Sequence, residues 1–272
     1  MNISLQFGRG LAAALLALVS YSVSTAGAWA ADAKPVLLYS LYFNAKGENR
    51  YAPTGAYRTV LEKLGQGFQT RTHDQQLNMD TLQDVSVVLI SNPNDKASGS
   101  NPPPPHCSAA DVAELTRFVR EGGGLIVMAN QEGHNLEIDD FNALLQAFGM
   151  KYVSNYTDAK RLTLPATAPL LGGLHWAYYT GNQIVLTPGH AAKPRAIVTN
   201  DLAQKPEKGP RDAAGILMAG ATLGKGHFVA VTDAGWITND ALSGKGVGGV
   251  AIQNHDNWEI MSRITRWAAG LP

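Results

Sequence analysis

The segment 108–150 constrains the fold most strongly, because it has the pattern of a helix, a buried strand and a second helix in succession. Ser108 with Asp111 forms a helix N-cap pattern, and apolar residues then recur at helical spacing. Glycines 122–124 predict the helix end, since glycine adopts left-handed conformations without a Cβ clash. Residues 125–129 are continuously apolar, which is typical of a strand buried on both faces. A polar loop then follows the carboxyl end of a central strand, where parallel α/β sheets bind ligands.

The same alternation extends to the first half of the chain. The expected elements are strands at 36–43, 68–72 and 85–90, and helices with apolar faces at 57–64 and 141–148. This order predicts an α/β fold with a doubly wound, mostly parallel sheet of the flavodoxin-like type.

Residues 151–220 lack strong helical patterns and predict a β-rich insertion or extension of antiparallel strands. Its short candidate strands lie at 161–164, 183–186, 196–199 and 216–219. Beyond it, residues 227–232 predict a further buried strand that ends in Asp233. Residues 257–269 predict a final helix with Asp256 as its N-cap.

The first residues have the pattern of a cleavable signal peptide. Arg9 precedes an apolar run, and Ala28-Trp29-Ala30 supplies a small-x-small cleavage site. We therefore expect a signal peptide at 1–30, one domain at 31–272, and a periplasmic or extracellular location. The apolar run is short for a membrane span, and no later run approaches that length.

Charge and cysteine content exclude several classes of protein. The 22 basic and 22 acidic side chains balance, so there is no electrostatic footprint for nucleic acid or an anionic membrane. Cys107 is the single cysteine, so stability must come from a hydrophobic core. His106, His190 and His255 show no metal-ligand spacing, and common catalytic and phosphate-binding motifs are absent. No metal and no cofactor are expected.

Three blocks of the sequence, in their order and spacing, resemble the class I glutamine amidotransferase-like fold. They are EGGGLIVMANQEGHNLEIDDFNALLQAFGM, GKGHFVAVTDAGWITNDAL and HDNWEIMSRITRWAAG. More specifically, they resemble a secreted branch associated with unsaturated rhamnogalacturonyl hydrolases. The resemblance spans 36–270 and is weakest in 151–220.

The resemblance implies the fold, but the catalytic nucleophile of the family is missing. Amidotransferases carry a cysteine on the turn after the central strand, where this chain has Asn130-Gln131-Glu132. Cys107 lies in a proline-rich loop before a helix, which is the wrong place for that role. Glutaminase activity is therefore not expected, and the chain has no room for the rhamnogalacturonyl hydrolase barrel.

Polar clusters follow four strands and are expected to converge at the carboxyl edge of the sheet. They lie at 44–50, 91–95, 130–135 and 233–240. Glu132 and Asp233 are the candidate catalytic residues, although turn formation would also explain them. The candidate ligand-binding residues are Asn44, Asn92, Asn130, Gln131, His134, Asn135, Trp236 and Asn239. Tyr42, Phe43 and Trp176 are further aromatic candidates for contact with a sugar ring.

These candidate residues are compatible with three functions. The first is a carbohydrate-binding module in pectin-type polysaccharide utilisation. The second is a hydrolase or lyase acting on a glycan through Glu132 and Asp233, whose carboxyl groups would lie roughly 5–9 Å apart. The third is a protein-interaction module, which an exposed apolar patch would favour.

Overall fold

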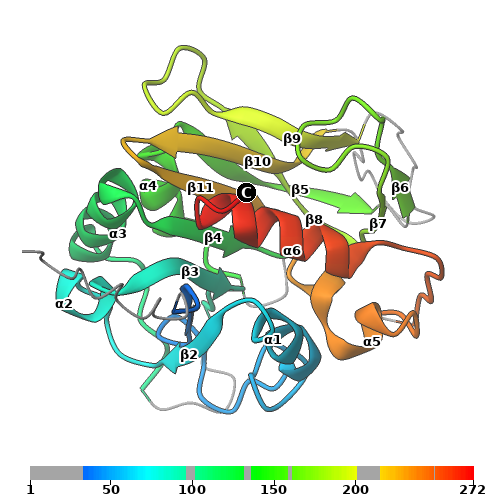
Figure 1. Cartoon of the computed structure of the whole chain (residues 1–272), viewed down its shortest axis with the longest axis horizontal. Helices are drawn as coiled ribbons and strands as arrows, with labels where there is room; N and C mark the ends of the chain where they lie inside the picture. The colour runs from blue at the N-terminus through cyan, green and yellow to red at the C-terminus, as the bar shows by residue number, and fades with distance from the viewer. Residues whose placement is uncertain (1–32, 96–101, 132–135, 159–160, 201–214, 248) are drawn as a thin grey trace, which may run out of the picture. The chain divides into compact units, whose positions relative to one another are not determined.

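The fold is described from a computed structural model, for residues 33–95, 102–131, 136–158, 161–200, 215–247 and 249–272. Its central feature is a nine-stranded sheet (Figure 1). In spatial order its strands are β2 (Gln69–His73), β1 (Val36–Ser40), β3 (Val85–Ser91), β4 (Gly124–Met128), β11 (Gly226–Val231), β10 (Gly215–Leu223), β8 (Thr180–Leu186) and β5 (Met150–Asp158). A further strand, β9 (Arg195–Asn200), pairs with β10.

The sheet has a parallel half and an antiparallel half. Strands β2, β1, β3, β4 and β11 pair in parallel. Strands β10, β8, β5 and β9 pair antiparallel and extend the sheet beyond β11. Two short strands, β6 (Arg161–Thr163) and β7 (His175–Ala177), form a separate ribbon. The expected α/β class with a large, mostly parallel sheet is therefore confirmed. The predicted antiparallel extension is confirmed in part, because β6 and β7 lie outside the main sheet.

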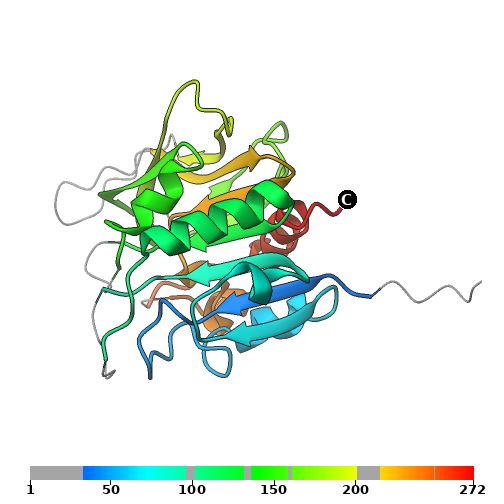
Figure 2. The same ribbon diagram turned by 90° about the vertical axis from the view of Figure 1, so that its left-hand side faces the viewer.

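Helices cover both faces of the sheet (Figure 1 and Figure 2). One face packs against α1 (Arg58–Leu64) and α6 (Asn257–Ala268). The other packs against α2 (Met79–Leu82), α3 (Ala109–Glu121) and α4 (Phe141–Gln146). The short η1 (Gly235–Ile237) and α5 (Asn239–Leu242) lie between β11 and α6 in sequence.

Each central strand contributes side chains to both cores. Leu37 and Tyr39 of β1 pack with α1 and α6, whereas Val36 and Leu38 pack with α3 and α4. Neighbouring residues point to opposite sides of a strand, so a strand covered on both faces needs a continuous apolar run. This explains why β1, β3 and β4 were recognisable from sequence alone.

Helix α3 forms as its sequence predicts. The Ser108 hydroxyl accepts a hydrogen bond from the Asp111 amide, while the Asp111 carboxylate accepts one from the Ser108 amide. Leu115, Phe118 and Val119 form the buried face. The helix ends at Gly122, whose φ of 128° is unfavourable for residues with a side chain.

Several predicted boundaries differ from the structure. The first strand ends at Ser40 rather than at 43, and the helix expected at 141–148 ends at Gln146. Strands β5 and β7 were not predicted. β5 is the edge strand of the sheet next to β8. An edge strand needs fewer apolar residues than a central strand, so the sequence pattern of β5 is weaker.

Asp256 precedes α6 as expected, but its side chain makes no cap hydrogen bond. Its carboxylate instead accepts a hydrogen bond from the His175 amide at 2.7 Å, which lowers the pKa of Asp256. Asp256 therefore links the start of α6 to β7. The helix-capping interpretation of this side chain was wrong.

None of the helices in the described part of the chain combines the length and apolar character that a membrane span requires. The predicted signal peptide at 1–30 lies outside the described residues, which form one compact unit from Lys34 to Pro272.

Candidate functional site

The loops that follow β1, β3, β4 and β11 emerge at one edge of the sheet. The parallel register sets Ser91 opposite Met128 and Met128 opposite Val231 at the ends of three neighbouring strands. Residues 130–131 and 233–240 consequently lie close together, as the sequence predicted.

A cavity of about 330 Å³ lies between these loops, and we call it the Asp233 cavity. It is lined by Arg50, Tyr51, Ala56, Asn130, Gln131, Tyr179, Thr180, Asp233, Gly235, Thr238, Asn239, Asp240, Gly246 and Val247. Its walls come from the segments after β1, β4 and β11 and from the turn before β8.

Asp233 is the buried acid of this cavity, with only 1% of its surface exposed. One carboxylate oxygen accepts a hydrogen bond from the Gly235 amide at 2.6 Å, and the other accepts from the Tyr179 amide at 3.4 Å. Burial raises the pKa of Asp233 to about 7, although these amide hydrogen bonds act in the opposite direction. Near neutral pH, Asp233 can therefore either accept or donate a proton.

Two residues that line the Asp233 cavity carry buried hydroxyl groups without a hydrogen-bond partner among the described residues. These groups are Tyr179 Oη and Thr180 Oγ1. Burial and the nearby Asp233 charge raise the pKa of Tyr179 to about 12, so its hydroxyl stays protonated. Buried polar groups are nearly always hydrogen-bonded, and these two can serve a bound ligand or water.

An Asn130–Tyr51 pair also lines the Asp233 cavity. Asn130 Nδ2 donates to Tyr51 Oη at 2.5 Å, and the side-chain oxygen Oδ1 of Asn130 accepts from the Gln131 amide at 2.9 Å. Because the Tyr51 oxygen accepts this bond, its own hydrogen can be donated to another group. Arg50 lies over the Tyr51 ring but is paired with Glu48 at 2.5 Å, so its charge is already neutralised.

The structure divides the predicted site residues into distinct groups. Asn130, Gln131, Asp233 and Asn239 line the Asp233 cavity. The Asn239 side chain accepts from the Thr59 amide and donates to the Gly55 carbonyl, so it also links α5 to the first turn of α1 and to the loop before it. Glu132, His134 and Asn135 lie outside the described residues.

Asn44 and Asn92 hold loops together. Asn44 Nδ2 donates to the carbonyls of Ser91 and Asn92, at 2.9 and 3.0 Å. Asn92 is fully buried with a φ of 46°, a left-handed conformation that asparagine tolerates better than most residues. Asn92 does not line the Asp233 cavity, and its buried side chain holds the loop after β3.

A second cavity, of about 500 Å³, adjoins the first and shares Tyr51 with it; we call it the proline-loop cavity. Asn44 and Tyr42 line it, together with the prolines 102–105. Among the described residues, its carboxylates are Glu48, which is paired with Arg50, and exposed Asp74.

Trp236 does not offer a face to a ligand, contrary to expectation. It is fully buried and contacts Trp176 edge-on, with ring centroids 5.4 Å apart. Trp176 and Phe43 are buried as well. These aromatic side chains belong to the core, which is the commoner fate of large aromatic residues.

Sequence reasoning missed Tyr51, Tyr179 and Thr180. Tyr51 directly follows a predicted polar cluster, so its position was a usable signal. Tyr179 and Thr180 lie in the region with the weakest pattern, and only the packing of the turn before β8 against Asp233 shows their importance.

Cys107 is buried and does not have the setting of a nucleophile. Burial, with the charges of Asp111, Glu137 and Asp140, raises the pKa of its thiol to about 12. The thiol stays protonated at neutral pH, whereas reactive cysteines need a lowered pKa.

No protein-family model matches the sequence, and no curated protein matches it. Among solved structures, the mmIFT52 N-terminal domain aligns with a TM-score of 0.61 at 11% identity, covering 86% of this chain and 96% of that domain. A ThuA-like protein from Bacteroides uniformis aligns at 0.53 and 12% identity, covering 89% and 94% of the two chains. A ThuA-like protein from Parabacteroides merdae aligns at 0.51 and 13% identity, covering 88% and 91%.

At these identities the comparisons bear on the fold alone. The agreement with ThuA-like proteins supports a glutamine amidotransferase-like fold for this chain. It carries no information on the ligand.

Proposed function

We propose that this protein binds a neutral, hydroxyl-rich ligand, a carbohydrate, in the Asp233 cavity. The observation that carries the proposal concerns Tyr179 and Thr180, which line the cavity and whose buried hydroxyls have no partner within the described ranges. A sugar hydroxyl can both donate and accept, so it could satisfy them at the same time as Asp233.

The size and charge of the Asp233 cavity suit such a ligand. Its volume of about 330 Å³ lies at the small end of the range for small-molecule sites, which matches one or two sugar rings. Arg50 is its cationic side chain and is paired with Glu48, which disfavours phosphate or strongly acidic ligands. Tyr51 and Asn130 add polar groups to the lining of the cavity.

The proposal includes the absence of glutaminase activity. The tip of β4 carries Asn130 and Gln131 where amidotransferases place their nucleophile, and Cys107 is buried with a raised pKa. Export through the signal peptide and a role in pectin-type polysaccharide utilisation are part of the same proposal. They rest on residues 1–30 and on the sequence resemblance.

Tyr179→Phe tests the binding site. Its hydroxyl has no partner in the described part of the protein, so this change should leave the melting temperature unchanged or slightly higher. The Kd of a glycan identified on an array should rise about 5- to 10-fold, the effect of one neutral hydrogen bond, as measured by calorimetry.

Tyr42→Phe is the matched control, because it removes a phenol from the neighbouring proline-loop cavity. It should not change the Kd. If no glycan binds, the carbohydrate proposal fails. If Tyr42→Phe weakens binding and Tyr179→Phe does not, the ligand occupies the other cavity.

A second candidate function is glycan hydrolysis or elimination, and the raised pKa of Asp233 favours it. An acid with a pKa of about 7 can act as a general acid or base near neutral pH. Glu132 remains the proposed partner, and Asp240 is a further carboxylate on the cavity wall. Asp233→Asn should abolish the formation of products from a bound glycan while retaining glycan binding. Chromatography of the reaction mixture would detect the loss of products.

The protein-interaction alternative gains no support from the surface. Val185 is the large hydrophobic side chain exposed in the described ranges, and a single residue does not make an apolar patch.

A further inference from the structure

His106, Glu137 and Asp140 come together on two loops at the same edge of the sheet. His106 lies between β3 and α3, and the two acids lie between β4 and α4. One potential ligand atom from each of the three residues lies within 4.8 Å of the others. Residue spacing did not indicate this cluster, since His106 is far from the two acids along the chain.

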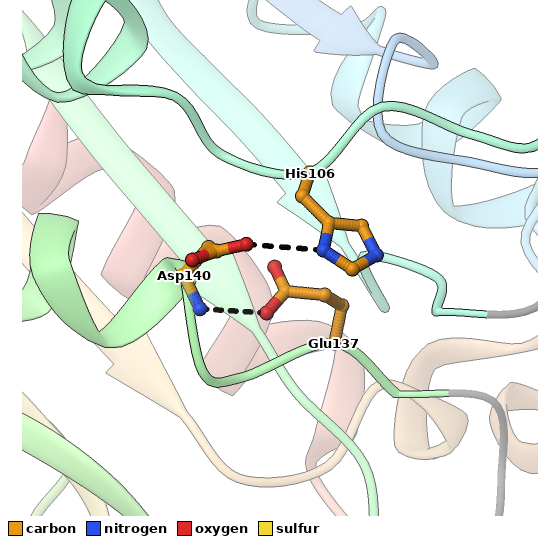
Figure 3. A group of neighbouring side chains, drawn as sticks. All are labelled: His106, Glu137 and Asp140. Atoms are coloured by element: carbon orange, nitrogen blue, oxygen red, sulfur yellow. Dashed lines mark hydrogen bonds and ion pairs between the residues drawn. The ribbon is translucent and has the colours of Figure 1, made fainter.

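Glu137 is the decisive member of the cluster. It is 96% buried, since only 4% of its surface is exposed. One carboxylate oxygen accepts a hydrogen bond from the Asp140 amide at 2.7 Å, and the other has no partner among the residues described. Figure 3 shows that second oxygen directed into the space between His106 and Asp140. A buried carboxylate oxygen without a partner is costly, and a cation bound at this point would satisfy it.

The histidine is oriented as metal-binding histidines are. His106 Nδ1 faces Asp140 at 3.0 Å (Figure 3), while Nε2 lies 3.4 Å from the Asp95 carboxylate. A ligating imidazole commonly donates its other ring N–H to a carboxylate, which fixes its tautomer. Asp95 can accept that bond, leaving Nδ1 with its lone pair directed at the cluster.

A protonated His106 between Asp95 and Asp140 would explain those two contacts. It would leave the buried second oxygen of Glu137 unsatisfied, because neither ring nitrogen forms an observed bond to it. A cation within the cluster satisfies all three side chains.

We propose that His106 Nδ1, Glu137 and Asp140 bind a divalent transition-metal ion such as Zn²⁺. One imidazole and two carboxylates suit this class, and water can complete the coordination. Ligand atoms of a tetrahedral zinc site lie about 3.4 Å apart. The cluster, whose atoms lie within 4.8 Å of one another, therefore needs a contraction of about 1.4 Å at most, while the His106–Asp140 pair at 3.0 Å needs a slight expansion. The ion would tie the loop after β3 to the start of α4, independently of the ligand in the Asp233 cavity.

The proposal is tested on purified, tag-free protein treated with EDTA and then titrated with Zn²⁺ or Ca²⁺. We expect one Zn²⁺ per chain by calorimetry and a Tm increase on the order of 5–10 °C at 100 times the Kd. Ca²⁺ should bind much more weakly, because it requires oxygen ligands. Calcium binding as tight as zinc binding would contradict the assignment.

Glu137→Gln and His106→Gln should each weaken Zn²⁺ binding at least 10-fold. Glu137→Gln retains a carbonyl oxygen for the Asp140 amide, so the loop should still fold. Asp139→Asn removes a charge from an exposed neighbouring carboxylate and should bind Zn²⁺ as the wild type does. Equal binding by all four proteins, or no binding by the wild type, would overturn the proposal.

A further measurement uses the wild-type protein and does not depend on whether any variant folds. In the unmodified protein, Zn²⁺ should shift the side-chain ¹⁵N resonance of a histidine Nδ1, at one equivalent of metal. Absence of this shift would also contradict the proposed ligation.

Discussion

Asp233→Asn is expected to remove a large part of the pH dependence of stability. Burial raises the pKa of Asp233 in the folded protein to about 7, from an ordinary value of 3.8. Its stabilising contribution is thus fully present below about pH 4 and is lost as the pH rises through 7. Between about pH 5 and pH 8, the free energy of unfolding should fall by about 2–3 kcal/mol from this group alone.

Asparagine does not ionise, so the variant should not show this loss. The measurement is urea unfolding of both proteins at several pH values, and the informative quantity is the difference between their free energies of unfolding. Asp240→Asn is the matched control, since it neutralises an exposed carboxylate on the wall of the same cavity. A difference that stays constant from pH 5 to pH 8 would show that Asp233 is charged throughout.

Asn257→Ala is expected to lower the free energy of unfolding by about 3–5 kcal/mol. The fully buried Asn257 side chain accepts from the Ala177 amide at 2.8 Å. It also donates to the carbonyls of Ala177 and Trp236, at 3.0 and 2.6 Å. Alanine would leave three buried backbone groups without these partners, and each carries a desolvation cost of about 1–3 kcal/mol.

Asn78→Ala provides the comparison for Asn257→Ala. Asn78 caps the short α2 at the surface, so its loss should cost only about 1 kcal/mol. Thermal unfolding of both variants distinguishes the two positions. Similar small losses would mean that the contact between α6, β7 and η1 contributes little to stability.

The central architecture could be predicted because its signals are local. Val36–Ser40, Val85–Ser91 and Gly124–Met128 are buried on both faces, and such strands require continuous apolar runs. The capping box at Ser108 and the glycine at 122 define α3 within one stretch of sequence. The convergence of the loops after β4 and β11 then follows from parallel pairing.

The roles of individual side chains could not be predicted in the same way. Trp236 and Asn92 have residue types suited to ligand contact, but both are fully buried. Asp256 has the sequence position of a helix cap, yet it binds the His175 amide from a distant strand. Residue type and local position do not reveal which distant backbone groups will lie within hydrogen-bonding distance.

The sequence by itself therefore determined the α/β class, the main helices and strands, and the sheet edge that carries Asp233. Only the tertiary structure decided that Tyr179 and Thr180 border Asp233, and that His106 meets Glu137 and Asp140. The physical reason is the range of the interactions. Helix caps and apolar periodicity act between neighbours in the chain, whereas burial and the satisfaction of polar groups depend on segments that meet only after folding.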